Sequence, residues 1–152
     1  MLSEFIDLLT SNTLEAQERE EIVARINKAP NHSNYQWTSG PEQAMAIELV
    51  LSLGDYVVIS DKIDEAHEQI QATFDESFPV FPENIDPSDV PAYFSWLAAE
   101  LANCGDDDGC ELLQLDPGLD DNMYFFVTNR RDSARILELA QKLGMHMHKT
   151  NS

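Results

Sequence analysis

The chain has 152 residues, of which 43% are apolar, and it holds only 6 glycines and 7 prolines. This length and composition are typical of one folded domain and exclude a collagenous or wholly disordered chain. Its 28 acidic residues outnumber 9 basic ones and give a formal net charge of −19. Phosphate binding needs a basic surface, so this charge argues against direct contact with nucleic acid or an anionic membrane.

The first residues of the chain predict its compartment. Glu4 and Asp7 stand where a secretory signal carries basic residues followed by an unbroken apolar run. The longest apolar runs fall far short of the about 20 residues that cross a bilayer. We therefore expect a cytoplasmic protein. Because the cytosol keeps thiols reduced, Cys104 and Cys110 are expected to be free, although the segment CGDDDGC could close a disulfide.

Apolar residues at helical spacing predict an N-terminal helical hairpin over about residues 1–28. Tyr35 and Trp37 then flank a polar residue and predict a short strand. Residues 39–42, SGPE, have the spacing of a capping box with proline in the first turn. This segment predicts the start of a helix that ends at Gly54.

The middle of the chain alternates β-prone and helical segments. Residues 56–59 are rich in β-branched and aromatic side chains and predict a strand. An amphipathic pattern predicts a helix over about residues 63–74. Residues 77–88 contain three prolines and predict a loop, after which apolar spacing predicts a helix over about residues 90–103.

The last third of the chain predicts a β-hairpin, a helix and a final strand. Residues 111–115 and 123–127 are the hairpin strands, joined by an acidic turn with proline and glycine. The helix ends at Gly144, and residues 145–148 alternate as the last strand. The sequence therefore predicts a single acidic α+β domain over the whole chain, with helices packed on a small, mainly antiparallel sheet.

Charge is distributed unevenly along the sequence. From Ile63 to Asn129 there is no Lys or Arg, but there are sixteen Asp or Glu. Self-repulsion destabilises a compact state, so a segment of one sign favours a functional cause, such as docking onto a basic protein. Solubility alone is the alternative explanation.

The candidate partner-binding residues are carboxylates of two acidic loops around the predicted strand at 111–115, with one aromatic side chain. They are Asp106, Asp107, Asp108, Asp116, Asp120, Asp121 and Trp96. Carboxylate oxygens also suit Ca²⁺, but the three consecutive aspartates lack the alternating spacing of an EF-hand. Solvated loops are the simpler interpretation, and the sequence predicts neither a metal nor a cofactor.

Histidine motifs give weaker signals. The tetrapeptide DEAH at residues 64–67 matches a helicase signature, but no glycine-rich loop is present to hold phosphates, so the match is chance. His146 and His148 share one face of the predicted last strand and could contact a common metal. Two ligands do not make a site, and no nucleophile motif appears, so the sequence leans against an enzyme.

The order of elements resembles a family of small bacterial proteins known only as a domain of unknown function. The matching features are the strand at Tyr35 and Trp37 with the helix after it, and the LLQLD strand, acidic turn, MYFFVT strand and helix ending at Gly144. They cover about residues 34–53 and 110–148. The resemblance implies an α+β fold in the bacterial cytoplasm and supplies no activity and no site residue.

Two function hypotheses follow. The leading one is a non-enzymatic acidic domain that docks onto a basic protein partner. Size and charge are similar to those of immunity proteins that neutralise basic toxins, and one variant would mimic the phosphate array of DNA. The alternative is a small metal- or small-molecule-dependent enzyme that combines carboxylates of the acidic loops with His146 or His148.

Overall fold

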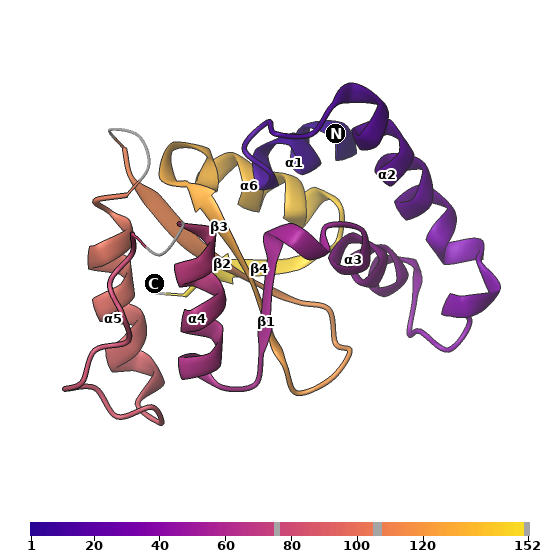
Figure 1. The fold of residues 1–152 in the computed structure, drawn as a ribbon. Coiled ribbons are helices and arrows are strands. Elements are labelled where there is room, and N and C mark those ends of the chain that lie inside the picture. The colour runs from indigo at the N-terminus through magenta and orange to yellow at the C-terminus, as the bar shows by residue number, and fades with distance from the viewer. Residues whose placement is uncertain (75–76, 105–107, 151–152) are drawn as a thin grey trace.

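An antiparallel sheet lies at the centre of the protein (Figure 1). The computed structural model describes residues 1–74, 77–104 and 108–150. Within these residues four strands pair in the order β1-β3-β2-β4. They are β1 Val57–Ser60, β2 Cys110–Asp116, β3 Met123–Asn129 and β4 His146–Lys149. The predicted hairpin of β2 and β3 is confirmed, with Leu113 opposite Phe126.

Strand β3 is central and apolar on both faces. Tyr124 and Phe126 belong to the core on one side of the sheet, and Phe125 belongs to the core on the other. Successive side chains of a strand point to opposite faces, so the continuous run YFF is what a strand covered on both sides requires.

Six α-helices and three short 3-10 turns surround the sheet within the described residues. The helices are α1 Leu2–Leu9, α2 Ala16–Lys28, α3 Pro41–Ser52, α4 Ile63–Thr73, α5 Val90–Leu101 and α6 Arg130–Lys142. The turns are η1 Ala29–Asn31, η2 Ser33–Tyr35 and η3 Gly54–Tyr56.

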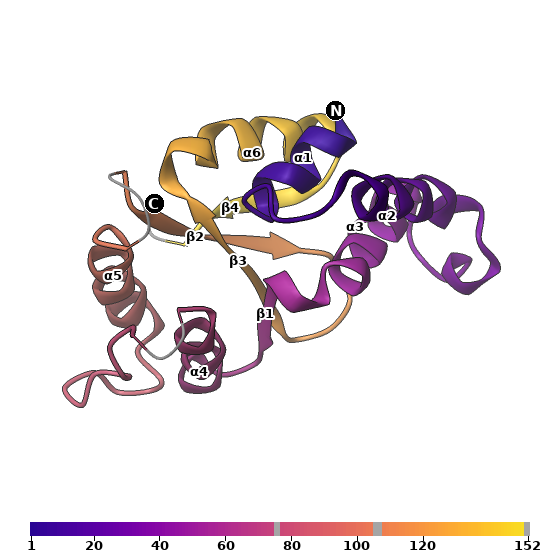
Figure 2. The ribbon, with the colours of Figure 1, turned by 45° about the horizontal axis from the view of Figure 1, so that its top comes forward.

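The helices form two groups, one on each face of the sheet. Helices α1, α2, α3 and α6 share a core with Leu113 and Leu115, whereas α4 and α5 share a second core with Val58 and Leu112. Figure 2 shows α1 and α6 on one side of the sheet and α4 and α5 on the other. The expected single α+β domain, with helices packed on a small antiparallel sheet, is confirmed.

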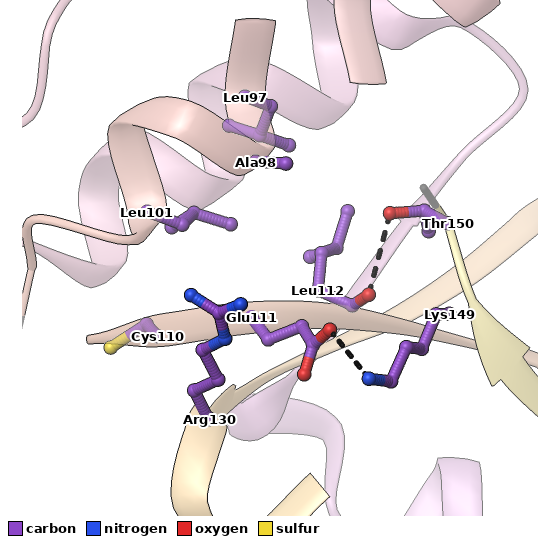
Figure 3. Close-up of a pocket in the computed structure, with 9 residues that line it drawn as sticks. All are labelled: Leu97, Ala98, Leu101, Cys110, Glu111, Leu112, Arg130, Lys149 and Thr150. Carbon is purple, nitrogen blue, oxygen red and sulfur yellow. Dashed lines mark hydrogen bonds and ion pairs between the residues drawn. The ribbon is translucent and has the colours of Figure 1, made fainter. Parts of the chain in front are cut away.

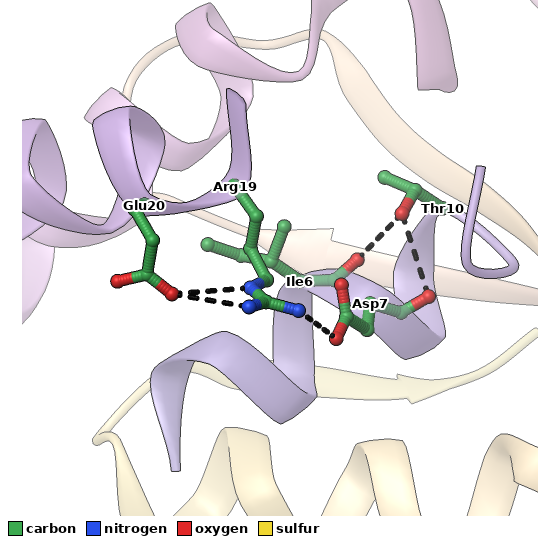
Figure 4. Close-up of polar contacts among 5 residues, drawn as sticks. All are labelled: Ile6, Asp7, Thr10, Arg19 and Glu20. Carbon is green, nitrogen blue, oxygen red and sulfur yellow. Dashed lines mark hydrogen bonds and ion pairs between the residues drawn. The ribbon is translucent and has the colours of Figure 1, made fainter. Parts of the chain in front are cut away.

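The two N-terminal helices are joined by polar contacts (Figure 4). An Nη atom of Arg19 on α2 donates to Asp7 of α1 at 2.9 Å, and Arg19 also lies 3.2 Å from Glu20. At the end of α1 the hydroxyl of Thr10 donates to the carbonyl oxygen of Ile6 at 2.9 Å, which satisfies one of the last carbonyls. The ion pair is partly exposed, so it contributes modestly to stability.

The predicted strand at Tyr35 and Trp37 is wrong. The segment forms η2 instead, where the N–H of Asn34 donates to Nδ1 of His32 at 3.1 Å. The indole N–H of Trp37 donates to the carbonyl of Asn34 at 2.7 Å. Side chains thus satisfy the backbone locally, and this competes with strand pairing. The aromatic alternation carried no information about a partner strand.

The predicted capping box at the start of α3 is also wrong. Glu42 does not bond back to Ser39; Oε1 of Gln43 accepts from the N–H and the hydroxyl of Ser39, at 2.7 and 2.9 Å. The amide nitrogen of Gln43 donates to the carbonyls of Pro117 and Gly118, at 3.2 and 2.9 Å. One side chain therefore ties the start of α3 to the turn between β2 and β3.

Candidate functional site

The part of the chain without basic residues folds largely into one layer. Helix α4, residues 77–89 and helix α5 lie together on one face of the sheet (Figure 2). Their apolar residues, such as Ile70 and Leu97, are buried toward the sheet. Side chains that remain exposed on these segments therefore belong to the layer on this face of the sheet.

We define the acidic layer as the carboxylates that these segments present. Its described members are Asp64, Glu65, Glu68, Glu83, Asp86, Asp89 and Glu100. Across residues 1–74, 77–104 and 108–150, none of the seven lies within 4.0 Å of a basic nitrogen. Lys62, exposed at the N-cap of α4, is the basic residue nearest in sequence.

Ion pairs lie elsewhere in the molecule. Arg135 on α6 is 2.8 Å from Glu4 of α1 and 3.1 Å from Glu138, which also pairs with Lys142 at 3.0 Å. The hydrogen bond with Glu4 is the main cause that raises the pKa of Arg135. The acidic charge around α1 and α6 is thus locally compensated, and that of the acidic layer is left to solvent and counterions.

Three members of the acidic layer also make local hydrogen bonds. Oε2 of Glu65 accepts from the hydroxyl of Ser60 at 3.3 Å. Oδ1 of Asp89 accepts from the N–H of Ala92 at 3.3 Å and caps α5. Oδ1 of Asp86 accepts from the hydroxyl and the N–H of Ser88, at 2.6 and 2.8 Å, and these bonds lower the pKa of Asp86. The side chains of Asp86 and Asp89 stay exposed.

Three other members make no such bond. In the part of the chain that the structure describes, the side chains of Asp64, Glu68 and Glu83 make no hydrogen bond and no ion pair, and all three are exposed. Asp64 lies in the first turn of α4, where the helix dipole favours a negative charge. Glu68 and Glu83 have no comparable structural explanation, so these carboxylates are available to a partner.

The two acidic loops chosen from the sequence lie at opposite ends of β2. Asp106 and Asp107 fall outside the described residues, and Asp108, which is exposed, precedes the strand. Asp116 ends the strand, and a strand of seven residues spans about 23 Å. The structure therefore does not bring the two loops together.

Carboxylates of the turn between β2 and β3 shape that turn. Asp116 accepts from the N–H of Gly118 at 3.0 Å, and Asp120 accepts from the hydroxyl of Tyr124 at 2.7 Å. The Tyr124 hydrogen bond lowers the pKa of Asp120, and burial together with Asp120 raises the pKa of Tyr124 to about 12. Asp121 is exposed beside them. These residues form a small acidic tip, separate from the acidic layer.

Trp96 lies in an aromatic cluster inside the layer, where it is only partly exposed. Its ring centroid lies 5.5 Å from that of His67, which is 1% exposed and contacts three further rings. Those rings belong to Phe78, Phe81 and Tyr93. Sequence reasoning missed this cluster, because its members are separated along the chain and His67 stood inside a chance motif.

The cluster attaches residues 77–89 to the two helices. Nε2 of His67 lies 2.8 Å from the carbonyl oxygen of Pro79, and Gln71 donates to the carbonyl of Phe78 at 3.2 Å. The rings of Phe81 and Tyr93 stack with centroids 5.2 Å apart. This packing holds the segment that carries Glu83 against α4 and α5.

His146 and His148 do not form a metal centre with the described carboxylates of the acidic loops. Both are exposed on β4, and His146 pairs in register with Asp116. His146, Asp116 and Glu42 line one pocket. Yet the described residues hold no group of three His, Cys, Asp or Glu placed to bind a metal ion. The carboxylate and histidine site of the alternative hypothesis is therefore not formed by these residues.

The structure has no disulfide between Cys104 and Cys110. Cys104 donates to the carbonyl of Glu100 at 3.4 Å, and Cys110 is buried. Burial, with the nearby Glu100 charge, raises the pKa of the Cys104 thiol. A raised pKa leaves little thiolate at neutral pH, so Cys104 is poorly suited to nucleophilic chemistry.

Comparisons with known proteins identify no family for this chain. No family model matches the chain, and no curated protein and no solved structure matches it. The resemblance to a small bacterial domain family stays a prediction. Among the described residues, no helix is long and apolar enough to cross a membrane.

Proposed function

We propose that the protein is a non-enzymatic domain of the bacterial cytoplasm that docks onto a basic protein through the acidic layer. One observation carries the proposal: α4, residues 77–89 and α5 contain no Lys or Arg and lie on one face of the sheet, and the described carboxylates of this acidic layer make no ion pair among the described residues. A surface of mixed charge destabilises a fold less than a surface of one sign, because like charges repel. A face of one sign therefore favours a functional cause such as docking onto a basic protein.

Charge complementarity defines the partner class. A basic protein gains attraction to this face at a distance and associates faster, while nucleic acids and anionic membranes are repelled. The effect weakens as salt shortens the Debye length. Two kinds of protein belong to this class. One is a basic toxin that this domain would neutralise as an immunity protein does. The other is a nucleic-acid-binding protein that would bind the carboxylates of the acidic layer in place of phosphates.

No specific observation favours the enzymatic alternative. It needs carboxylates of both acidic loops to converge with His146 or His148, and the described ends of these loops lie at opposite ends of β2. In the acidic tip, Asp116 pairs in register with His146 of β4.

Zero-length cross-linking in native cells tests the proposal. A carbodiimide joins carboxylates directly to lysine amines in contact with them. We expect cross-links from Glu68 and Glu83 to lysines of one protein with a basic isoelectric point. These cross-links should not form when the carbodiimide is added only after lysis in about 1 M salt, where the Debye length is about 3 Å.

The same experiment carries its own control. Exposed carboxylates of α2, such as Glu18, react with the carbodiimide but lie outside the acidic layer. Cross-links of equal yield from Glu18 and Glu68 to the partner, or a cross-linked partner that is acidic, would contradict docking through this layer.

A further inference from the structure

A separate cavity lies at the edge of the sheet, between α5 and the start of β2 (Figure 3). Its volume is about 200 Å³, which suits a ligand smaller than the drug-sized molecules that occupy larger pockets. Leu97, Leu101 and Leu112 form an apolar wall. The polar lining consists of Glu111, Arg130, Lys149 and Thr150.

Glu111 brings a buried acceptor into this cavity. Its Oε1 lies 3.4 Å from Nζ of Lys149 on the neighbouring strand. Its Oε2 is buried and has no hydrogen-bond partner among the described residues. A buried carboxylate oxygen without a donor is costly, so this atom needs an N–H or O–H from a molecule that enters the cavity.

Arg130 brings an unused donor. Its backbone N–H bonds to the carbonyl of Gly109 at 3.0 Å, which places the residue at the cavity edge. Within the described part of the chain its guanidinium has no ion pair and no hydrogen bond, although the protein has 28 acidic residues. By contrast, Arg135 on the same helix pairs with Glu4 and Glu138.

These complementary groups define the ligand. A guanidinium fork binds a carboxylate through paired hydrogen bonds, and the free Glu111 oxygen accepts from an ammonium group. A simple anion would be repelled by the net charge of −19, whereas a zwitterion has no net charge. We propose that this cavity binds a small zwitterion of the amino-acid class, with its carboxylate on Arg130, its ammonium on Glu111 and its side chain against the leucines.

Titration of the isotope-labelled protein followed by NMR tests this assignment independently of the docking proposal. Leucine is the probe, 4-methylpentanoate retains only the carboxylate, and 3-methylbutylamine retains only the amine. We expect saturable shifts of the Glu111, Arg130 and Thr150 amides with leucine, and affinities about tenfold weaker or more for both partial compounds. Equal binding of a partial compound would overturn the assignment.

Variants separate ligand binding from folding. Arg130→Gln removes an exposed charge and should weaken leucine binding about tenfold, whereas Arg131→Gln, next in the same helix, should not. Glu111→Gln should weaken binding similarly, and its amide spectrum reports whether it folds. A titration with leucine up to about 10 mM detects dissociation constants in the millimolar range. The absence of any saturable shift in this range would overturn the proposal. Normal leucine binding by the Arg130→Gln variant would also overturn it.

Discussion

Nδ1 of His67 lies 2.8 Å from the hydroxyl oxygen of Tyr93, and both side chains are completely or almost completely buried. A carbonyl oxygen only accepts, so the bond with Pro79 requires the proton of the imidazole on Nε2. Burial lowers the pKa of His67 and so favours the neutral imidazole, in which Nδ1 accepts from the Tyr93 hydroxyl. A second proton on Nδ1 would reverse this hydrogen bond.

This geometry predicts how stability depends on pH. Burial lowers the pKa of His67 in the folded protein, so at mildly acidic pH the unfolded chain binds a proton that the folded protein does not. The free energy of unfolding should therefore fall as pH drops below about 6.5, by up to about 1.4 kcal/mol per pH unit. Urea unfolding between pH 7.5 and 5.5 measures the slope, and His67→Gln should flatten it. An unchanged slope in that variant would refute the explanation.

Tyr93→Phe tests the hydrogen bond itself. The substitution keeps the ring and leaves Nδ1 of a buried imidazole without a donor, which should lower the free energy of unfolding by about 1–3 kcal/mol. Tyr124→Phe is the matched control, because its hydroxyl bonds to the exposed Asp120 and the loss should stay below about 1 kcal/mol. Equal losses in the two variants would contradict the account.

Gln69 protects an edge of the sheet. Its amide donates to the carbonyl of Ile59 at 2.7 Å and accepts from the N–H of Ile59 at 2.9 Å, on edge strand β1. Exposed edge strands pair with other chains, so Gln69→Ala should increase concentration-dependent self-association, measured by sedimentation. Gln17→Ala, at an exposed site on α2, should leave it unchanged. A monomeric Gln69→Ala protein at high concentration would show that another feature blocks the edge.

Gly109 allows the chain to enter β2. Its φ is +76°, and a Cβ there would lie 2.3 Å from the carbonyl oxygen of Ala102. A residue other than glycine in this left-handed backbone conformation typically costs about 1 kcal/mol. Gly109→Ala should destabilise the fold by more than this amount, because its Cβ would also clash with Ala102. Gly118→Ala, with φ +66° and only the Gln43 side chain nearby, should cost about that smaller amount. Thermal unfolding compares the two, and the reverse order would be inconsistent with this geometry.

Much of the fold was predictable because it depends on local patterns. Apolar spacing at 3.6 residues predicted the helix of Leu97 and Leu101, and the aromatic run at Tyr124 predicted a strand. The segment at Tyr35 failed because two alternating aromatics do not specify a partner strand, and local side-chain bonds satisfied the backbone first.

Sites were less predictable because they depend on contacts distant along the chain. His67 and Tyr93 are 26 residues apart, and no local pattern pairs them. No local pattern singles out Arg130, and only the structure places it at a cavity, where its guanidinium has no carboxylate partner among the described residues. The separation of the two acidic loops, in contrast, follows directly from the predicted strand between them.

The most direct test of docking through the acidic layer is the rate at which this protein associates with the partner identified by cross-linking, measured at low and high salt. A layer variant, Asp64→Asn with Glu68→Gln and Glu83→Gln, removes three charges that make no hydrogen bond and no ion pair within the described residues. A control variant, Glu15→Gln with Glu18→Gln and Glu21→Gln, removes three exposed charges of the opposite layer.

We predict that the layer variant associates about tenfold more slowly at low salt, that the control variant changes the rate much less, and that high salt removes the difference. Equal slowing in both variants, or a rate of the wild-type protein that does not respond to salt, would contradict docking through the acidic layer.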